Sequence, residues 1–503
     1  MHALLKYIVS CCIISAIFPA SNVLLAQLYI SPGAALTIKN GTSLYVGTDL
    51  TIKSSSTASG YLVDQTMSDG VVVTGNILIE RYLTSGGWHN VSAPLSNASS
   101  SLFTGTDLVF YFDETLVLND WNFGWVWYSG NLSVMRGYDV FLPSTPVTTQ
   151  YSTTNPSQLN SGSYTIGVTL TTIADGETPN HKGWNLLGNP YPSPVDWLVE
   201  SAWNKTSIND AKYIWDPVGN VYTIFLGGGS PIGLNGGTQY IPSNQGFWVQ
   251  AVQNGNVQLD NSARIGLTPS TPDFYKSTDI EYPVIRLIAK GNGFKDETIV
   301  RFIDRSTDEF DRNLDALKLF SPNQQVPQLA SQLNNSYLAV NTLHEIQENL
   351  IVPLYFNAGQ DGTYSIELTE QSSFISSMLC HLFDSKYEEY YTLKIDSAYS
   401  FDFKSTDNKN RFSLLFSSDD KPEIIKKEDY KVFTKGDVIT INHISETNKN
   451  IYFSIYNMVG QRITNGRLNL QPTYSFRSDL PAACYIVEIL DGNTVSRHKI
   501  KIN

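Results

Sequence analysis

The stretch "GWNLLGNPYPSPVDW", residues 183–197, joins a short apolar run to an Asn-Pro step and a Pro-Tyr-Pro-Ser turn. An earlier stretch, "GGWHNVSAPLSN" at residues 86–97, has the same order of Gly-Trp, apolar strand, small residue and proline. Because proline cannot donate to a β-ladder, both stretches predict a strand that ends at its proline. The pattern favours a structural corner within a repeated β-unit. The competing hypothesis is an aromatic ligand platform.

Two further pairs of stretches extend this duplication. "FYFDE" at residues 110–114 corresponds to "YIWDP" at 213–217, and "RGYDVFL" at 136–142 corresponds to "QGFWVQA" at 245–251. Three matching elements in one order predict a duplicated, Trp-rich β region over residues 81–275. We therefore expect Trp88 and Trp184 to be buried at equivalent positions of two similar units.

The composition is that of a strand-rich chain. Charged residues make up 16% of the 503 residues, aromatic residues make up 12%, and Thr, Ser, Asn and Gly are abundant. β-Branched and aromatic side chains favour strands, whereas small polar residues favour turns, so an all-β, multidomain fold is predicted. A net charge of −13 argues against nucleic acid as a partner, because phosphate binding needs a concentrated basic face.

The N-terminal residues 1–26 have the features of a signal peptide. Lys6 precedes an apolar run that is too short to span a bilayer, and cleavage is expected after Ala26. Residues 8–11 also resemble a lipoprotein box, but the apolar run continues beyond them. No later segment has the ~20 apolar residues of a membrane helix, so the mature chain is predicted to have no transmembrane segment.

Four further segments follow the signal peptide. Residues 27–80 contain short apolar segments between turn residues and predict β-strand repeats, stacked as in a small β-solenoid. The duplicated region comes next, and a Pro/Ser/Thr-rich connector at 268–283 separates it from a β-sandwich over 280–418, jelly-roll or Ig-like. A charged linker leads to a small Ig-like sandwich over 425–503. Cys380 and Cys484 fall in different segments, so no disulfide is expected.

The segment over residues 425–503 is basic, unlike the acidic remainder, and carries four motifs in a specific order. "VFTKGDVITIN" is followed by "NIYFSIYNMVGQRI", then "LPAACYIVEIL", then "SRHKIKIN". This order resembles the type A C-terminal sorting domain of the Bacteroidetes type IX secretion system. In that family an apolar strand leads to a Gly turn followed by Lys or Arg, then a Gly-x-Tyr strand and a lysine-bearing final strand.

The motif positions transfer residue by residue. The first strand and turn correspond to Tyr456, Gly460 and Arg462, the second strand to Tyr485, and the last to Lys499 and Lys501. Ala483 stands where the family usually has glycine, which puts the geometry of that turn in doubt. The resemblance implies export across the inner membrane and recognition by type IX machinery. The product would be secreted or would lie on the outer-membrane surface, released or attached to lipopolysaccharide.

Motifs for catalysis and metal binding are weak. The sequence has neither a Gly-x-Ser-x-Gly elbow nor a phosphate loop, and its seven histidines are not paired at metal-ligand spacing. We therefore predict no catalytic residue and no cofactor, although acidic pairs leave glycosidase-like chemistry open. A structural calcium ion is conceivable at "DRSTDEFDRNLDA", where Asp308, Asp311 and Asp315 follow Asp304, but the EF-hand spacing is missing. These aspartates are expected to cap turns instead.

The functional hypotheses follow from these observations. The leading one is a secreted or cell-surface non-catalytic β-protein, an adhesin or binding module exported by the type IX route. The alternative is a polysaccharide-binding or polysaccharide-active exported protein. In "WNFGWVW" the odd spacing of Trp121, Trp125 and Trp127 predicts one strand face with three rings, which would suit a glycan groove. A surface glycan or lipopolysaccharide would be the partner.

Overall fold

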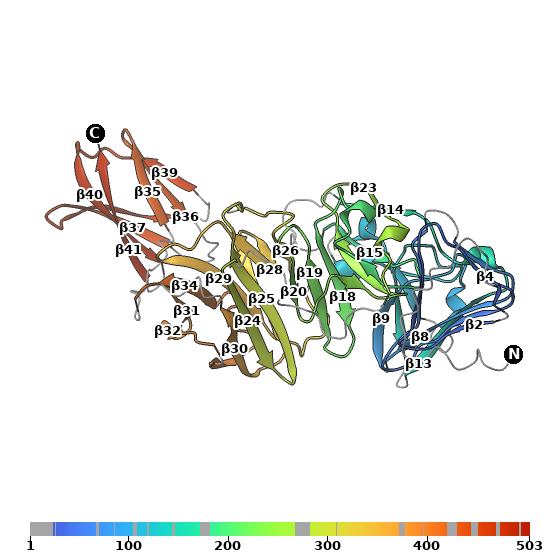
Figure 1. The fold of residues 1–503 in the computed structure, drawn as a ribbon. Helices are drawn as coiled ribbons and strands as arrows, with labels where there is room; N and C mark the ends of the chain where they lie inside the picture. Colours follow the sequence, from blue (N-terminus) through green and yellow to red (C-terminus); the bar gives the residue numbers. More distant parts are fainter. Residues whose placement is uncertain are drawn as a thin grey trace. The chain divides into compact units, whose positions relative to one another are not determined.

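A computed structural model of the chain is all-β (Figure 1). It describes residues 24–502 except 26, 67–69, 85, 104–107, 118–119, 143–145, 172–181, 267–281, 308, 372–377, 396, 420–429, 444–450, 469–472 and 492–493. The predicted signal peptide lies almost wholly outside the described residues. Two compact units are present, Met1–Lys421 and Pro422–Asn503, and each is described by itself. Within the described ranges, no helix is long and apolar enough to cross a membrane.

The first unit begins with a β-solenoid, as the short apolar segments predict. Successive coils place their strands in parallel register, so that Leu28 pairs with Leu50 and Leu50 with Ile77. The apolar side chains of these strands point into one core. The stacked sets are β1 (Leu24–Leu25), β4 (Leu44–Val46) and β7 (Val71–Val73); β2 (Leu28–Ile30), β5 (Leu50–Ile52) and β8 (Ile77–Leu83); and β3 (Ala35–Ile38) with β6 (Tyr61–Asp64).

Two similar antiparallel sheets follow the solenoid. Their strand orders are β11-β10-β12-β9 and β20-β19-β18-β22-β15, so in each the strand that begins with Gly-Trp or Trp pairs with the last strand of its set. The first sheet contains β9 (Gly87–Val91), β10 (Val109–Phe112), β11 (Trp125–Trp127) and β12 (Tyr138–Leu142). The second contains β15 (Trp184–Gly188), β18 (Ala211–Asp216), β19 (Val221–Leu226), β20 (Ile232–Leu234) and β22 (Gly246–Gln250).

The register of the two sheets agrees residue by residue. Trp88 pairs with Phe141, and the corresponding Trp184 pairs with Gln250. The two tryptophans therefore occupy equivalent positions, as expected from the sequence. Their burial differs: Trp184 is fully buried, whereas Trp88 is 36% exposed. The expectation that Trp88 is a core residue is wrong: Trp184 lies in a core that later strands complete, with Leu338 among their residues, whereas Trp88 is not part of that core.

The stretch at 183–197 contains β15 and the corner that directly follows it in the chain. Asn189 is buried and donates its side-chain amide to three backbone carbonyls, those of Ser193, Ile241 and Pro242, at 2.9–3.2 Å. Its side-chain oxygen accepts from the N–H of Tyr191 at 3.0 Å. This arrangement agrees with the structural-corner hypothesis, because the polar atoms of the turn are used within the fold.

The same corner attaches the solenoid. The Tyr191 ring lies 4.8 Å from the buried Arg264 guanidinium, which donates to the carbonyl of Leu62 at 2.7 Å. The Leu62 N–H in turn donates to the carbonyl of Pro192 at 3.1 Å. The Pro-Tyr-Pro turn thus contacts a segment far away in sequence, which explains why it carries both an aromatic ring and prolines.

The remainder of the first unit is one sheet of eleven described strands rather than two separate sheets. In it β28 pairs with β25 in parallel and with β27 in antiparallel orientation, which makes the sheet continuous. Phe401 of the edge strand lies 5.0 Å from Phe356 of a central strand, so the sheet folds over its own core. The strands are β24 (Val284–Gly291), β25 (Phe294–Phe302), β26 (Ala316–Leu317), β27 (Gln328–Leu333), β28 (Ser336–Leu343), β29 (Leu350–Asn357), β30 (Gly362–Gln371), β31 (Leu379–Asp384), β32 (Glu389–Thr392), β33 (Ala398–Phe403) and β34 (Phe412–Ser417).

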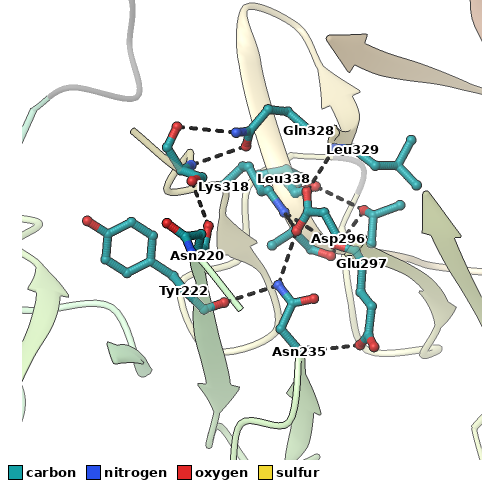
Figure 2. A network of polar contacts seen from close by, with 12 residues as sticks. Asn220, Tyr222, Asn235, Asp296, Glu297, Lys318, Gln328, Leu329 and Leu338 are labelled. Atoms are coloured by element: carbon teal, nitrogen blue, oxygen red, sulfur yellow. Dashed lines mark hydrogen bonds and ion pairs between the residues drawn. The ribbon is translucent and has the colours of Figure 1, made fainter. Parts of the chain in front are cut away.

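This sheet and the duplicated region share a hydrophobic core, although the connector at 268–283 predicts separate segments. A buried polar network crosses the same junction (Figure 2). Asp296 lies at its centre, paired with Lys318 at 2.6 Å and accepting from the Asn235 amide at 3.1 Å. Because an unpaired buried charge is costly, this network fixes how the two sheets meet.

The second unit is a seven-stranded sandwich among its described residues. Three strands form one sheet and four form the other, and their apolar faces enclose a separate core. The three-stranded sheet contains β35 (Tyr430–Lys435), β36 (Val438–His443) and β39 (Thr473–Arg477). The four-stranded sheet contains β37 (Ile451–Asn457), β38 (Arg462–Leu468), β40 (Ala483–Asp491) and β41 (Thr494–Ile502). The small sandwich predicted for this segment is present.

Candidate functional site

The three tryptophans predicted to line a glycan groove do not share one strand face. Trp121 lies in a short 3-10 turn (Trp121–Gly124), whereas Trp125 and Trp127 lie on β11. The Trp121 and Trp125 rings pack 5.3 and 5.6 Å from the buried Trp248 ring. Of the three, only Trp127 is largely exposed, at 59%. The predicted face is not formed because residues 121–124 form a 3-10 turn and the extended strand begins only at Trp125. The odd spacing of the three tryptophans therefore does not place Trp121 on the strand.

Trp127 instead lies beside three other aromatic residues. We call the four residues the aromatic row: Trp88, Phe110, Trp127 and Phe141. Phe110 is the cross-strand partner of Trp127, and its ring lies 5.7 Å from Trp88. Trp88 lies 5.3 Å from Phe141. Exposed aromatic faces of this kind can stack on sugar rings. The sequence did not reveal this set because Trp88 and Trp127 belong to different stretches.

A buried carboxyl group lies on the same sheet face as the aromatic row. Asp139 pairs in register with Phe110 and accepts from the Asn90 amide at 2.8 Å. Burial raises the pKa of Asp139 to about 8, because removal from water disfavours the charged form. At neutral pH this group is therefore mainly protonated and can donate a hydrogen bond.

The acidic segment at 304–315 has the geometry of capped turns. Asp311 accepts from the N–H of Thr307 at 2.6 Å, and Asp315 accepts from the N–H groups of Asp311 and Thr342 at 2.7 Å each. These carboxylates face backbone donors rather than one another, which does not fit a calcium cage. Burial raises the pKa of Asp315 to about 6. Asp308 lies outside the described residues, and within the described part of the chain no group of three His, Cys, Asp or Glu side chains could hold a metal ion.

The buried titratable groups His381, His89 and Cys380 do not have the properties of catalytic groups. His381 is hydrogen-bonded to the carbonyl of Asp419 and the hydroxyl of Thr392, both at 3.0 Å. Burial lowers the pKa of His89 to about 4 and raises the pKa of the Cys380 thiol to about 12. A neutral buried thiol is a poor nucleophile, since the thiolate is the reactive form. Cys380 and Cys484 are free cysteines, in different units.

In the second unit, the sorting-motif residues come together. Tyr456 pairs with Arg462 on one side and with Ile486 on the other, and Ile486 pairs with Lys499. Tyr456, Arg462, Ile486 and Lys499 therefore form one row across all four strands of the sheet, which we call the motif row. Directly paired residues point to the same face of a sheet. Arg462 and Lys499 are exposed and leave the row with two cationic side chains.

The remaining motif residues have different places. Gly460 has a φ of 82° in the β37–β38 turn, a conformation that favours glycine. Tyr485 points into the core and donates from its hydroxyl to the carbonyl of Pro481 at 2.9 Å. Lys501 is exposed on the final strand, two residues after Lys499. Ala483 begins β40 in extended backbone, so the replaced glycine is not required there.

Comparison with known proteins assigns a family to the first unit. Residues 6–416 match the model of a family described as a domain of unknown function, DUF8693. The chain belongs to this family. The DUF8693 match ends shortly before Pro422, where the second unit begins. No curated protein matches the chain.

Several solved structures are distantly similar to the chain. A biofilm-associated protein BSP domain is 9% identical with a TM-score of 0.13, over 85% of this chain and 92% of that structure. The Bacillus anthracis TIE protein is 9% identical with a TM-score of 0.11, over 85% and 69%. A Salmonella alpha-2-macroglobulin reacted with methylamine is 8% identical with a TM-score of 0.13, over 84% and 32%. Scores this low carry no argument about function.

Proposed function

We propose that this DUF8693 protein is a secreted or cell-surface β-protein without catalytic activity, exported by type IX machinery that recognises its C-terminal unit. The motif row carries the proposal. Its residues come from three separate sequence motifs, yet they meet on one face of a unit with its own hydrophobic core. Such a face can be recognised without unfolding or contacting the first unit.

The first unit supports the role of a binding scaffold. Two of its buried titratable side chains, Asp296 and His381, are bonded within the fold. Extended β-scaffolds carry binding groups on exposed sheet faces and loops. We therefore infer that the first unit is the exported cargo, an adhesin or binding module, and that the second unit is its secretion signal.

Deletion of residues 422–503 tests whether the second unit is the secretion signal. In a host with a type IX system, the full-length protein should be cleaved by protease added to intact cells. The truncated protein should be protected and should be recovered from the periplasm. The double change Arg462→Ser and Lys499→Ser should weaken export while leaving the unit folded, because both side chains are exposed. Normal surface delivery of the truncated protein would exclude the proposal.

Polysaccharide binding is the second candidate function, and the exposure of Trp127 and Trp88 in the aromatic row favours it. Stacking of a sugar on an exposed aromatic side chain requires the ring, so removal of the ring should remove the contact. On a glycan array, Trp127→Ala should therefore reduce any signal from this surface severalfold. Phe383→Ala serves as a control on a different sheet. An array signal that is unchanged in Trp127→Ala argues against this surface.

A further inference from the structure

A cleft of about 670 Å³ lies between the duplicated region and the eleven-stranded sheet. Its apolar lining comes from Leu198, Trp203, Ile208 and Pro231, and its polar lining includes Glu200 and Arg312. Ligand sites commonly occupy clefts of about 300–1,000 Å³ where two parts of a fold meet. This cleft is distinct from the aromatic row, which lies on the first of the duplicated sheets.

The walls of the cleft are held in place by hydrogen bonds. The Arg312 guanidinium donates to the carbonyls of Thr206 and Ile208, at 3.2 and 2.6 Å. The Arg312 carbonyl accepts from the N–H of Asp210 at 3.2 Å. Gly228 has a φ of 48°, and a Cβ there would lie 1.6 Å from the carbonyl oxygen of Asn313. The two sides of the cleft are therefore tightly docked, which gives a preformed site.

The charges in the cleft balance. Lys205 is paired with Asp210 at 2.5 Å and with Glu200 at 3.3 Å. The Glu200 side chain is 71% exposed, and Arg312 supplies the second positive charge. Two acidic and two basic side chains give no net charge, so neither an anion nor a cation is favoured overall. The lining still offers strong acceptors and strong donors close together.

We propose that this cleft binds a neutral saccharide. Each sugar hydroxyl both donates and accepts, so a short oligosaccharide can donate to the Glu200 carboxylate and accept from the Arg312 guanidinium nitrogens other than Nη2, which the carbonyls of residues 205, 206 and 208 already hold. Leu198 and Pro231 are the more exposed apolar lining residues and can contact the C–H faces of the sugar rings, whereas Trp203 is 7% exposed and packs against Trp197 at 4.9 Å. Saccharide binding here rests on the cargo role of the first unit and does not depend on the export route.

The test uses the purified full-length protein and calorimetric titration with four neutral trisaccharides, those of β-1,4-linked glucose, mannose, xylose and N-acetylglucosamine. At least one should bind, with an affinity unchanged between about 0.05 and 0.5 M NaCl because the ligand is uncharged. Asn313→Trp places a large ring at the cleft and should weaken binding at least about tenfold. Glu200→Gln keeps the shape and should weaken it severalfold.

Asn335→Trp, on an exposed turn outside the cleft, is the matched control and should bind like the wild type. Failure of all four trisaccharides to bind would overturn the proposal. So would binding that survives Asn313→Trp but is lost in Trp127→Ala, because the aromatic row would then be the site. Neither result would bear on export, which is measured in cells with the truncated chain.

Discussion

The buried side chain of Asn189 joins segments of backbone that are distant in sequence. Its amide is shared among three carbonyls, and its oxygen holds the N–H of Tyr191. Such a residue cannot be replaced by a smaller one without leaving several buried acceptors unpaired. The Asn-Pro corner of the second copy, where the first copy has Ala93-Pro94, is thus explained by hydrogen bonding at a single position.

Asn189→Ala should lower the free energy of unfolding by about 3 kcal/mol, since each orphaned buried acceptor costs roughly 1–3 kcal/mol. Urea denaturation followed by tryptophan fluorescence checks this, because all nine tryptophans lie between residues 88 and 248 and report on the first unit. The exposed Asn335→Ala serves as control and should change stability by no more than about 0.5 kcal/mol. Equal effects of the two changes would contradict the role of Asn189.

Asp139 makes a pH-dependent contribution to stability. Its pKa is about 8 in the folded chain and about 4 in the unfolded chain, so the folded state binds the proton more tightly. Its contribution is complete below pH 4 and is lost as the pH rises towards 8. Asp139→Asn should therefore remove a slope of up to ~1.4 kcal/mol per pH unit in this window.

The measurement is the difference in unfolding free energy between Asp139→Asn and the wild type at pH values from 5 to 8. The variant should gain relative stability as the pH rises. The exposed Asp304→Asn serves as a charge-matched control. A difference that is constant with pH would mean that Asp139 ionises as readily in the folded chain as in the unfolded one.

At the scale of elements, the two duplicated sheets keep one register but have diverged in what covers them. Trp184 is buried and lies 4.8 Å from the Tyr213 ring, whereas the equivalent Trp88 lies in the exposed aromatic row. A duplicated unit can therefore preserve a tryptophan for packing in one copy and leave its equivalent on the surface in the other.

Trp184→Ala should destabilise the first unit by about 3–5 kcal/mol, because it removes a fully buried ring. Trp88→Ala should cost only about 1 kcal/mol, since part of that ring already contacts water. Chemical denaturation of the two variants, followed by near-ultraviolet circular dichroism, compares them directly. Losses of similar size would show that the two positions are covered to the same extent.

Local sequence patterns predict those elements whose structure depends mainly on residues close to them in the sequence. Alternation of apolar residues predicts the solenoid strands, and the repeated Gly-Trp-to-proline order predicts both sheets and their equivalent registers. The turn-capping role of Asp311 and Asp315 also follows from local chemistry. Burial of Trp88 could not be predicted, because it depends on strands that arrive much later in the chain.

The cleft was beyond sequence reasoning for the same reason. Glu200, Pro231 and Arg312 come from three separate segments, and the one that drew attention in the sequence, residues 304–316 with Arg312, indicated a metal ion rather than a sugar. Trp121 was misplaced because the spacing rule assumes an extended segment, whereas its backbone forms a 3-10 turn. Shared packing across the connector at 268–283 likewise depends on long-range contacts such as that of Asn235 with Asp296.

At the scale of the whole molecule, the proposed function assigns a different role to each of the two units. The first contains the solenoid, the duplicated sheets and the cleft, and nearly all of it belongs to the DUF8693 family. The second has its own core and carries the motif row. If the proposed secretion signal lies on the surface of the second unit, that unit should direct export of any folded protein to which it is joined.

Transfer of residues 422–503 to an unrelated periplasmic reporter enzyme is the measurement that tests this claim most directly. In a type IX host, the fusion should appear on the cell surface or in the medium. The reporter alone should stay in the periplasm. A fusion with Gly460→Val should be exported less efficiently, because a β-branched residue opposes the φ of 82° in the turn. If the unaltered fusion is folded and stable yet remains in the periplasm, the second unit is not a secretion address.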